Sequence, residues 1–336
     1  MTGAVVFLAL IAVIDNFLVV ESDPKLENMA SIDAGVFKMG SETGLADERP
    51  VHEVSLEAFW IDKFEVSNRD FAKFIEATGY ITQSEKGEGG LVFASPNESL
   101  DPEKWWNLIA SANWRHPNGS DGELAQINNE NHPVVQVSFD EALAYCNWLG
   151  KDLPTEAQFE FAARGGREGE IYTWGSQPLH LSEAVTNFWQ GAENDEIAND
   201  GYTGTAPVGS YPPNAHQLYD ISGNVWEWVS DWYHPNYYAI SEREDPRGIE
   251  PDKIVEGNSA APAMRSLRGG SFLCSDEHCS GFRVSARMPV APTSSSNHTG
   301  FRCVKNSKTV PVAFDGPNLV SQFGSICQNG CTVFAC

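Results

Sequence analysis

Two cysteines five positions apart, Cys274 and Cys279, follow a Gly-Gly-Ser turn in the stretch RGGSFLCSDEHC. The tetrapeptide between them, SDEH, is polar and must face water or a cleft. Two neighbouring thiolates bind soft metals, and Cu(I) accepts two sulfur ligands, whereas zinc requires four ligands. No second Cys or His pair stands at zinc-finger spacing. From the residues alone, a short disulfide and a pair of working thiolates are about equally favoured.

Candidate ligands for a hard cation lie in LYDISGNVWEW, where Asp220 and Glu227 flank a run of backbone carbonyls. Such an oxygen-rich, irregular segment is the kind of site that Ca²⁺ prefers. Glu227 stands between two tryptophans, so it is either exposed on the polar side of a strand or paired if buried. A similar loop is possible between Asn187 and Asp200. Because nothing matches an EF-hand, the residues alone favour ordinary turns and an exposed strand face.

The elements that must position these residues are short. Alternating apolar and polar residues from Gly35 to Asn68 predict strands, and Ser67 then begins a helix. Capping boxes, Ser138 with Glu141 and Thr155 with Gln158, begin two more helices, which end at Gly150 and Gly165.

Long stretches of the chain carry turn residues instead of a regular period. From residue 85 to residue 131 the sequence is rich in Gly, Asn, Pro and Ser with recurring aromatic residues, which predicts long ordered loops. Beyond Gly165 helical periods are few, and no repeat or linker divides the chain. We therefore expect one α+β domain with much irregular structure.

Length and charge limit the possible partners. The chain has 336 residues, of which 41% are hydrophobic and 20% charged, which fits a globular protein. A net charge of −24 disfavours nucleic acid and anionic membranes, since phosphates are repelled. We expect no nucleotide cofactor, and a monomer or weak dimer.

The N-terminus, residues 1–22, is predicted to be a signal peptide or an N-terminal anchor. Its apolar run has the length of a signal-peptide core and is short for a membrane span, which needs about 20 apolar residues. Glycosylation sequons at Asn97, Asn118 and Asn297 agree with a glycoprotein of the secretory pathway. The endoplasmic reticulum lumen is the expected location, with a secreted or membrane-anchored protein as the alternative.

Several segments of the chain together resemble the sulfatase-modifying-factor family. They are GVFKMGSE, FEVSNRDFAKFIEATGY, HPVVQVSFDEALAYCNWLGKDLPTEAQFEFAARGG, LYDISGNVWEW, RGGSFLC and GFRC, and they occur in the family's order from about Ala34 to Val304. The paired cysteines resemble those of the catalytic branch, the formylglycine-generating enzymes. This resemblance implies that residues 23–305 form a single loop-rich α+β domain, distantly similar to C-type lectins.

The resemblance also implies an activity. Family members oxidise the cysteine of a C-x-P-x-R motif in unfolded sulfatases to Cα-formylglycine, using Cu(I) and O2. By this similarity Cys274 and Cys279 bind the copper, and Ser271 and Trp226 line the catalytic pocket. Glu65 and Asn297 are the implied substrate-binding residues, Glu65 through a charge-assisted pair with the substrate arginine.

Two structural Ca²⁺ sites and one disulfide are implied in the same way. The first site would use Asn187 and Asp200 with the carbonyls of Phe188 and Tyr202. The second would use Asp220 and Glu227 with the carbonyls of Gly223 and Val225. The implied disulfide joins Cys146 to Cys303.

Two features depart from the family pattern. His278 stands where the family has an aromatic phenol, so the proton-transfer details of the family do not carry over directly. The segment 306–336 forms a tail without a familiar counterpart, and its odd number of cysteines leaves at least one free or intermolecular.

Three other functions compete with an oxidase. A catalytically silent paralogue would bind sulfatases without oxidising them, but such paralogues typically lack the cysteine pair. A non-haem iron sulfoxide synthase needs an H-x3-H-x-E motif, which none of the histidines here provides. A lectin-like binding module would need no paired thiols.

Overall fold

The computed structural model describes residues 26–93, 105–119, 129–182, 185–189, 200–250, 263–275 and 279–307. The expectations for the leader 1–22, the Asn97 sequon and His278 lie outside these ranges, as does the tail beyond Ser307. Across the described ranges, none of the helices combines the length and apolarity needed to span a membrane.

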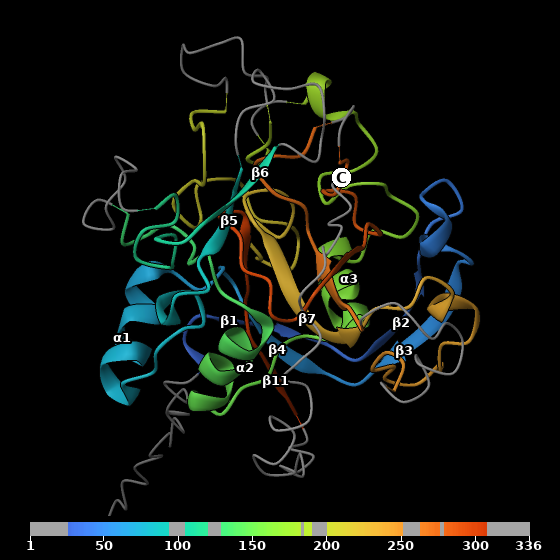
Figure 1. The fold of residues 1–336 in the computed structure, drawn as a ribbon. Helices are drawn as coiled ribbons and strands as arrows, with labels where there is room; N and C mark the ends of the chain where they lie inside the picture. The colour runs from blue at the N-terminus through green and yellow to red at the C-terminus, as the bar shows by residue number, and fades with distance from the viewer. Residues whose placement is uncertain are drawn as a thin grey trace, which may run out of the picture.

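Short strands form two small sheets and two hairpins (Figure 1). One sheet has the order β1-β4-β11, from Met29–Ile32, Phe59–Asp62 and Val304–Asn306. The other has the order β10-β7-β8-β9, from Thr299–Gly300, Trp226–Trp232, Arg265–Arg268 and Met288–Val290. The hairpins are β2-β3, from Gly35–Met39 and His52–Leu56, and β5-β6, from Gly90–Phe93 and Trp106–Ile109. Only β10 and β7 pair in parallel among these strands.

The three expected α-helices are present: α1 (Asn68–Thr78), α2 (Phe139–Trp148) and α3 (Glu156–Arg164). The caps of α1 and α3 act as predicted, whereas at α2 Glu141 accepts from the Ser138 N–H (2.7 Å) but the Ser138 hydroxyl has no partner within the described ranges. The Thr155 hydroxyl accepts from the Gln158 N–H (3.1 Å), and the Gln158 side chain accepts from the Thr155 N–H (3.0 Å). The described 3-10 helices are Ala46–Glu48, Ser84–Lys86, Leu179–Leu181 and Tyr237–Ala239.

The loop-rich α+β architecture is confirmed, with one local correction. Loops alone were expected from residue 85 to residue 131, whereas the structure places the β5-β6 hairpin there, with Phe93 opposite Trp106. The ring centroids of these two aromatic residues lie 5.5 Å apart. Such cross-strand aromatic pairs stabilise a hairpin. The loop prediction relied on the content of turn residues, which does not report these pairs.

Two groups of buried side chains make the core. One surrounds α3, whose Phe159 packs with Phe37 and Ile61. The other is aromatic and lies against α1 and α2, which sit side by side in Figure 1. The disulfide between Cys146 and Cys303, implied by the resemblance, joins α2 to the residue before β11 (Cα–Cα 5.7 Å).

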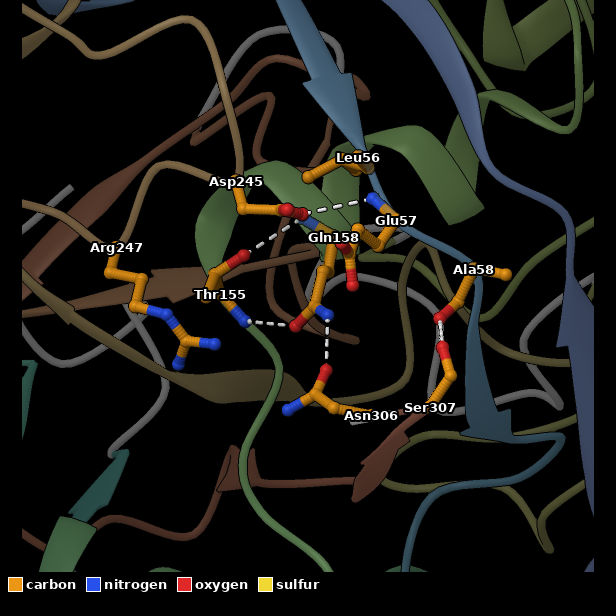
Figure 2. Close-up of a pocket in the computed structure, with 9 residues that line it drawn as sticks. All are labelled: Leu56, Glu57, Ala58, Thr155, Gln158, Asp245, Arg247, Asn306 and Ser307. Atoms are coloured by element: carbon orange, nitrogen blue, oxygen red, sulfur yellow. Dashed lines mark hydrogen bonds between the residues drawn. The ribbon is translucent and has the colours of Figure 1, made fainter. Parts of the chain in front are cut away.

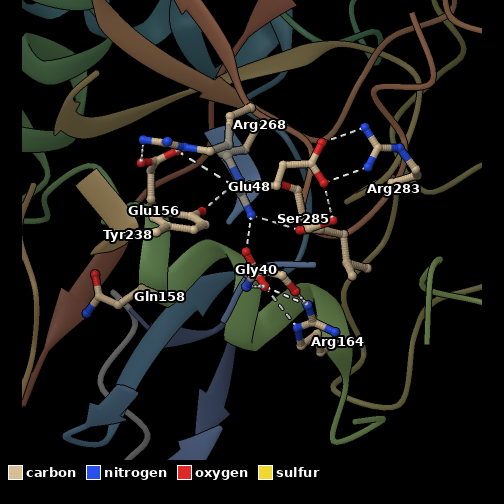
Figure 3. A network of polar contacts seen from close by, with 12 residues as sticks. Gly40, Glu48, Glu156, Gln158, Arg164, Tyr238, Arg268, Arg283 and Ser285 are labelled. Carbon is tan, nitrogen blue, oxygen red and sulfur yellow. Dashed lines mark hydrogen bonds and ion pairs between the residues drawn. The ribbon is translucent and has the colours of Figure 1, made fainter. Parts of the chain in front are cut away.

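A buried ionic network connects α3 to the end of β8 (Figure 3). Arg268 is fully buried, and its guanidinium donates to Glu160 (2.6 Å) and to the carbonyls of Val284 (2.8 Å) and Ser285 (3.3 Å). Burial disfavours the charged form, but Tyr238 and the carboxylates of Glu160 and Glu156 raise the pKa of Arg268. Because Arg268 directly precedes Gly269, this network fixes the point from which the cysteine segment begins.

We expect an Arg268→Met variant to lose about 3–5 kcal/mol of unfolding free energy, because it leaves buried acceptors and part of a buried charge without a partner. Denaturant unfolding would measure this loss. Arg243→Met is the control, since Arg243 is exposed and its pairs with Glu53 and Glu244 lie in water. Equal stabilities of the two variants would contradict a structural role for the network.

Candidate functional site

A glycine turn delivers the cysteine segment to the interior. Gly269 and Gly270 have φ values of 93° and 76°, in the left-handed region that favours glycine. A Cβ atom on Gly270 would also collide with the backbone of Gly281 and Phe282. The turn therefore needs glycine for two reasons, and it brings the chain after β8 against the segment that follows Cys279.

The structure joins Cys274 and Cys279 as a disulfide, with a Cα–Cα distance of 4.9 Å. Two separate thiolates were expected, so the structure shows the oxidised form of the pair. The reason is local: Ser275 and Cys279 form a bridge, and the Ser280 N–H donates to the Ser275 carbonyl (3.2 Å). This turn places the Cα atoms within the range of about 4.4–6.8 Å that a disulfide requires. Reduction to two thiols must precede any metal binding by the pair.

Ser271, expected to line the catalytic pocket, lies beside Cys274 and is not part of the lining of the cavities of 440, 290 and 570 Å³. Its N–H donates to Cys274 Sγ (3.4 Å), and its hydroxyl accepts from the Leu273 N–H (3.2 Å). Ser271 and Cys274 are fully buried, whereas Cys279 is half-buried.

Trp226 begins β7 and places its indole against Gly281, two residues after Cys279. Its Nε1 is buried and has no hydrogen-bond partner within the described ranges. An unpaired buried donor is costly in a native protein. Its position near the cysteines marks the place where a bound molecule could accept from it.

His298 is a residue that the sequence analysis missed. Its Nδ1 lies 3.1 Å from Ser271 Oγ, and its carbonyl accepts from the Trp226 N–H (2.9 Å). Burial lowers the pKa of His298 to about 3, so the ring is neutral. Its position directly before β10 could have indicated a place near the site, but the NHT triplet around it was interpreted only as a sequon.

Asn297 lies on the wall of a cavity next to the cysteine turn. The cavity has a volume of 440 Å³, and its lining includes Phe93, Trp114, Trp189, Phe272 and Leu273. Trp189 is tied to the site, since its N–H donates to the Cys274 carbonyl (2.8 Å). Aromatic walls with a few polar groups suit a small molecule or an extended peptide.

The Asn297 side chain is held by two partners at this wall. Its carbonyl accepts from the Phe93 N–H (3.3 Å), and its amide donates to Asn118 Oδ1 (2.9 Å). Asn297 therefore lies on the cavity wall in contact with Asn118, and its role in substrate binding stays a prediction.

A second cavity, of 290 Å³, is lined by residues that include Leu56, Thr155 and Arg247 (Figure 2). Its polar lining is already paired: Gln158 donates to Asn306 Oδ1 (2.7 Å), and the Glu57 N–H donates to Asp245 Oδ1 (3.0 Å). Its lining contains no cysteine or histidine. A larger cavity, of 570 Å³, is lined by Glu65 and likewise has no cysteine or histidine in its lining. The cavity at Asn297 is the one whose lining includes Phe272 and Leu273 of the cysteine segment, so it is the candidate binding site.

Glu65 has a different environment from the expected one. It is 2% exposed, and its carboxylate accepts from Asn224 Nδ2 (2.6 Å) and the Val225 N–H (3.3 Å). Burial, and then the nearby Asp220 and Glu227, raise the pKa of Glu65 well above its usual value. Glu65 thus belongs to an internal acidic cluster and does not line the cavity beside the cysteines.

The residues expected at the second calcium site form the rest of this cluster. Both oxygens of Glu227 pair with Arg302 (2.7 and 2.8 Å). Asp220 Oδ1 is buried without a partner in the described chain, and burial raises the pKa of Asp220 to about 6. Three carboxyl groups face one guanidinium, so ionisation of all three would leave two negative charges uncompensated, which agrees with the raised pKa values of Glu65 and Asp220. A divalent cation has the charge that would balance them.

The first expected calcium set is arranged around Asp200. The Asp200 carboxylate accepts from the N–H groups of Phe188 (3.0 Å) and Tyr202 (3.1 Å). Asn187 Oδ1 is buried without a partner within the described ranges, as a ligand atom would be in the absence of its ion. In the same ranges no three His, Cys, Asp or Glu side chains converge as a metal site, since both sets depend on amide and carbonyl oxygens. The donor atoms present fit a hard cation.

Comparison with known proteins gives consistent matches over most of the chain. A family profile described as sulfatase-modifying factor enzyme 1-like domain matches residues 16–307. The formylglycine-generating enzyme of Streptomyces coelicolor is 43% identical over 289 residues, which cover 82% of this chain and 88% of that protein. The formylglycine-generating enzyme of Mus musculus is 38% identical over 291 residues, covering 83% and 75% respectively.

Other matches are more distant. The inactive C-alpha-formylglycine-generating enzyme 2 of Bos taurus is 34% identical over 299 residues, covering 84% of this chain and 90% of that protein. Among solved structures, PvdO from Pseudomonas aeruginosa matches with a TM-score of 0.59 and 25% identity, covering 83% of this chain and 94% of PvdO. Relatives named as active and as inactive enzymes are both similar to this chain, so overall similarity alone does not assign it to either group.

Proposed function

This chain belongs to the sulfatase-modifying factor family, and from that premise we propose that it is a formylglycine-generating enzyme that matures sulfatases. The observation that carries the proposal is the cysteine pair. Cys274 and Cys279 lie beside Ser271, in the turn that borders the 440 Å³ cavity. A catalytically silent relative would have no need of such a pair.

The reduced pair provides a suitable site for Cu(I), the proposed cofactor. Two adjacent thiolates favour a soft cation with low coordination number and disfavour harder ions. When bound, Cu(I) would supply reactivity toward O2. The half-buried Cys279 gives a substrate thiol a route to the pair, while the buried Cys274 stays shielded from water.

The proposed reaction converts a substrate cysteine to an aldehyde. Its –CH2–SH group loses two electrons and two protons to give a thioaldehyde, and water then replaces sulfur, releasing hydrogen sulfide. O2 takes those two electrons and two more from an external thiol reductant, and with four protons both of its oxygen atoms end as water. The oxygen of the aldehyde comes from the water that replaces sulfur. The same reductant would open the Cys274–Cys279 disulfide.

The protein's own residues would bind and orient the substrate. The aromatic cavity would hold an extended, unfolded sulfatase segment with the C-x-P-x-R motif, and Asn297 lies on its wall. Trp226 is buried and does not line this cavity, so its unpaired Nε1–H would serve the cysteine side of the site and not the bound peptide. Glu65 lines a separate cavity of 570 Å³, so its proposed pairing with the substrate arginine would have to be made there.

The test is to incubate Cu(I)-loaded protein with a C-x-P-x-R peptide, a thiol reductant and O2. Mass spectrometry should detect the formylglycine peptide and its hydrate. A peptide with serine in place of the cysteine is the control for substrate, and a Cu(I) chelator is the control for metal. Binding of the cysteine peptide without any conversion would favour the silent-paralogue alternative.

We also propose that both acidic loops bind structural Ca²⁺. Removal of Ca²⁺ with EGTA should lower the melting temperature, because a ligand at a hundredfold excess over its Kd stabilises by about 2.7 kcal/mol. Restoring Ca²⁺ should reverse the change, and Mg²⁺ is the control, since it accepts irregular sites less readily. A Glu227→Gln variant should show a smaller response to EGTA than the parent. An unchanged melting temperature of the parent in EGTA would contradict this proposal.

The secretory pathway is the proposed location. The buried Cys146–Cys303 disulfide supports an oxidising compartment, where such bonds persist. Unfolded sulfatase chains entering the same compartment would be the partners.

A further inference from the structure

The Ser271 hydroxyl is held from two sides inside the protein. The Leu273 N–H donates to Ser271 Oγ (3.2 Å), and His298 Nδ1 lies 3.1 Å from the same oxygen. The Ser271 N–H also donates to Cys274 Sγ (3.4 Å), and the Cys274 N–H donates to the Ser271 carbonyl (2.9 Å). A continuous set of contacts therefore runs from the imidazole through Ser271 to Cys274.

His298 is rigidly placed to serve this contact. Its carbonyl accepts from the Trp226 N–H (2.9 Å), and its ring centroid lies 4.7 Å from that of Trp106 on β6. It is 9% exposed. Burial alone shifts the pKa of the imidazole, with no contribution from a charged group, so the ring remains neutral.

A neutral imidazole held in one place can fix the rotation of the Ser271 hydroxyl, which a mobile solvent molecule cannot do. A serine oxygen has one proton and two lone pairs, and the Leu273 N–H already occupies one lone pair. Nδ1 either accepts the hydroxyl proton or donates to the second lone pair. In both tautomers the rotation of the hydroxyl is defined, in the residue whose backbone N–H donates to Cys274 Sγ.

We propose that His298 is a positioning residue that holds the Ser271 hydroxyl in its working orientation beside Cys274. This inference rests on the proposed formylglycine-generating function. Neither His298 nor Ser271 lines the 440 Å³ cavity. Their loss should therefore affect the chemical step and leave the binding of the peptide intact.

Steady-state kinetics with the C-x-P-x-R peptide tests the proposal. His298→Leu should lower kcat by about 10- to 100-fold, the usual effect of removing an outer-shell partner, with KM changed by less than about twofold. His298→Asn should recover kcat to within about threefold of the parent, since its amide reaches the Nδ1 position and can donate or accept. His216→Leu is the matched control, because this histidine contacts the Ala162 carbonyl on α3, away from the cysteines.

A double-mutant cycle separates positioning from a general loss of structure. If His298 acts through Ser271, the His298→Leu, Ser271→Ala double variant should be no slower than Ser271→Ala alone. Additive losses, or a KM that rises with the fall in kcat, would overturn the proposal in favour of a packing role. Should His298→Leu fail to fold, a folded His298→Asn with kcat below the parent by about 10-fold or more would also overturn it.

The same experiment distinguishes a failure of the proposed function from a failure of the positioning role. A parent protein that produces no formylglycine overturns the proposed function and the role of His298 with it. An active parent with an equally active His298→Leu variant overturns the positioning role alone.

Discussion

A Cys279→Ser variant should lose formylglycine formation by at least about 10³-fold while keeping its fold, since a reacting group removed from a catalytic unit abolishes most of its effect. Cys274→Ser should behave in the same way. With only one thiolate left, the proposed Cu(I) site loses half of its sulfur ligands, so copper affinity and turnover should fall together. Peptide affinity should persist, because the cavity wall is unchanged.

The stability of these variants should change little. The disulfide between Cys274 and Cys279 closes a loop of only five residues, which the chain-entropy model values at about 2 kcal/mol. The Gly269–Gly270 turn and the Ser280–Ser275 hydrogen bond remain to support the segment. Under reducing conditions even the loop contribution vanishes, and parent and variant should unfold at nearly the same denaturant concentration.

Three measurements check this prediction: conversion of the peptide by mass spectrometry, Cu(I) affinity by competition, and denaturant unfolding under reducing conditions. Oxidation of the peptide at the parental rate by either serine variant would refute the copper-oxidase proposal. A large loss of stability in the reduced state would show that the pair is structural.

Local signals in the sequence predicted the elements that local contacts define. The caps at Ser67, Ser138 and Thr155 involve residues within three positions, so they are readable without knowledge of the fold. The glycine turn before the cysteines has the same character. These features located the three helices and the glycine turn correctly.

Non-local contacts account for what the sequence did not show. The parallel pairing of β10 with β7 joins residues more than 70 positions apart, and this pairing is what brings His298 to Trp226. The burial of Glu65 likewise depends on Asn224, which is 159 positions away. The hydrophobic periodicity of a segment indicates which of its faces is buried. It does not indicate which distant segment packs against that face.

The buried clusters around Arg268 and around Glu65 differ in their ratio of carboxylate to guanidinium groups, and this difference indicates different roles. Around Arg268, each of the two carboxylates, Glu156 and Glu160, pairs with at least one guanidinium group, from Arg164, Arg268 or Arg287. Around Glu65, three carboxylates share Arg302 alone. The carboxylates around Arg268 therefore have enough guanidinium partners, whereas those around Glu65 outnumber theirs, which is the basis for the proposed Ca²⁺ site there.

The second large effect concerns the other disulfide. Replacing Cys146 and Cys303 together with alanine should lower the free energy of unfolding by about 4–5 kcal/mol, because the lost bond closes a loop of 157 residues. Both residues are fully buried, and the bond joins α2 to the strand that completes the β1-β4-β11 sheet. The peptide assay on still-folded protein should show near-parental turnover, the reverse of the result for Cys279→Ser.

Reduction of the parent gives an independent check. Mild reductant without denaturant should open Cys274–Cys279 first, since Cys279 is half-buried, and should leave the buried Cys146–Cys303 bond intact. Peptide mapping after alkylation would identify which thiols were released. Equal release of all four thiols in folded protein, or a double alanine variant less than about 1 kcal/mol below the parent, would contradict the stabilising role assigned to the long-loop disulfide.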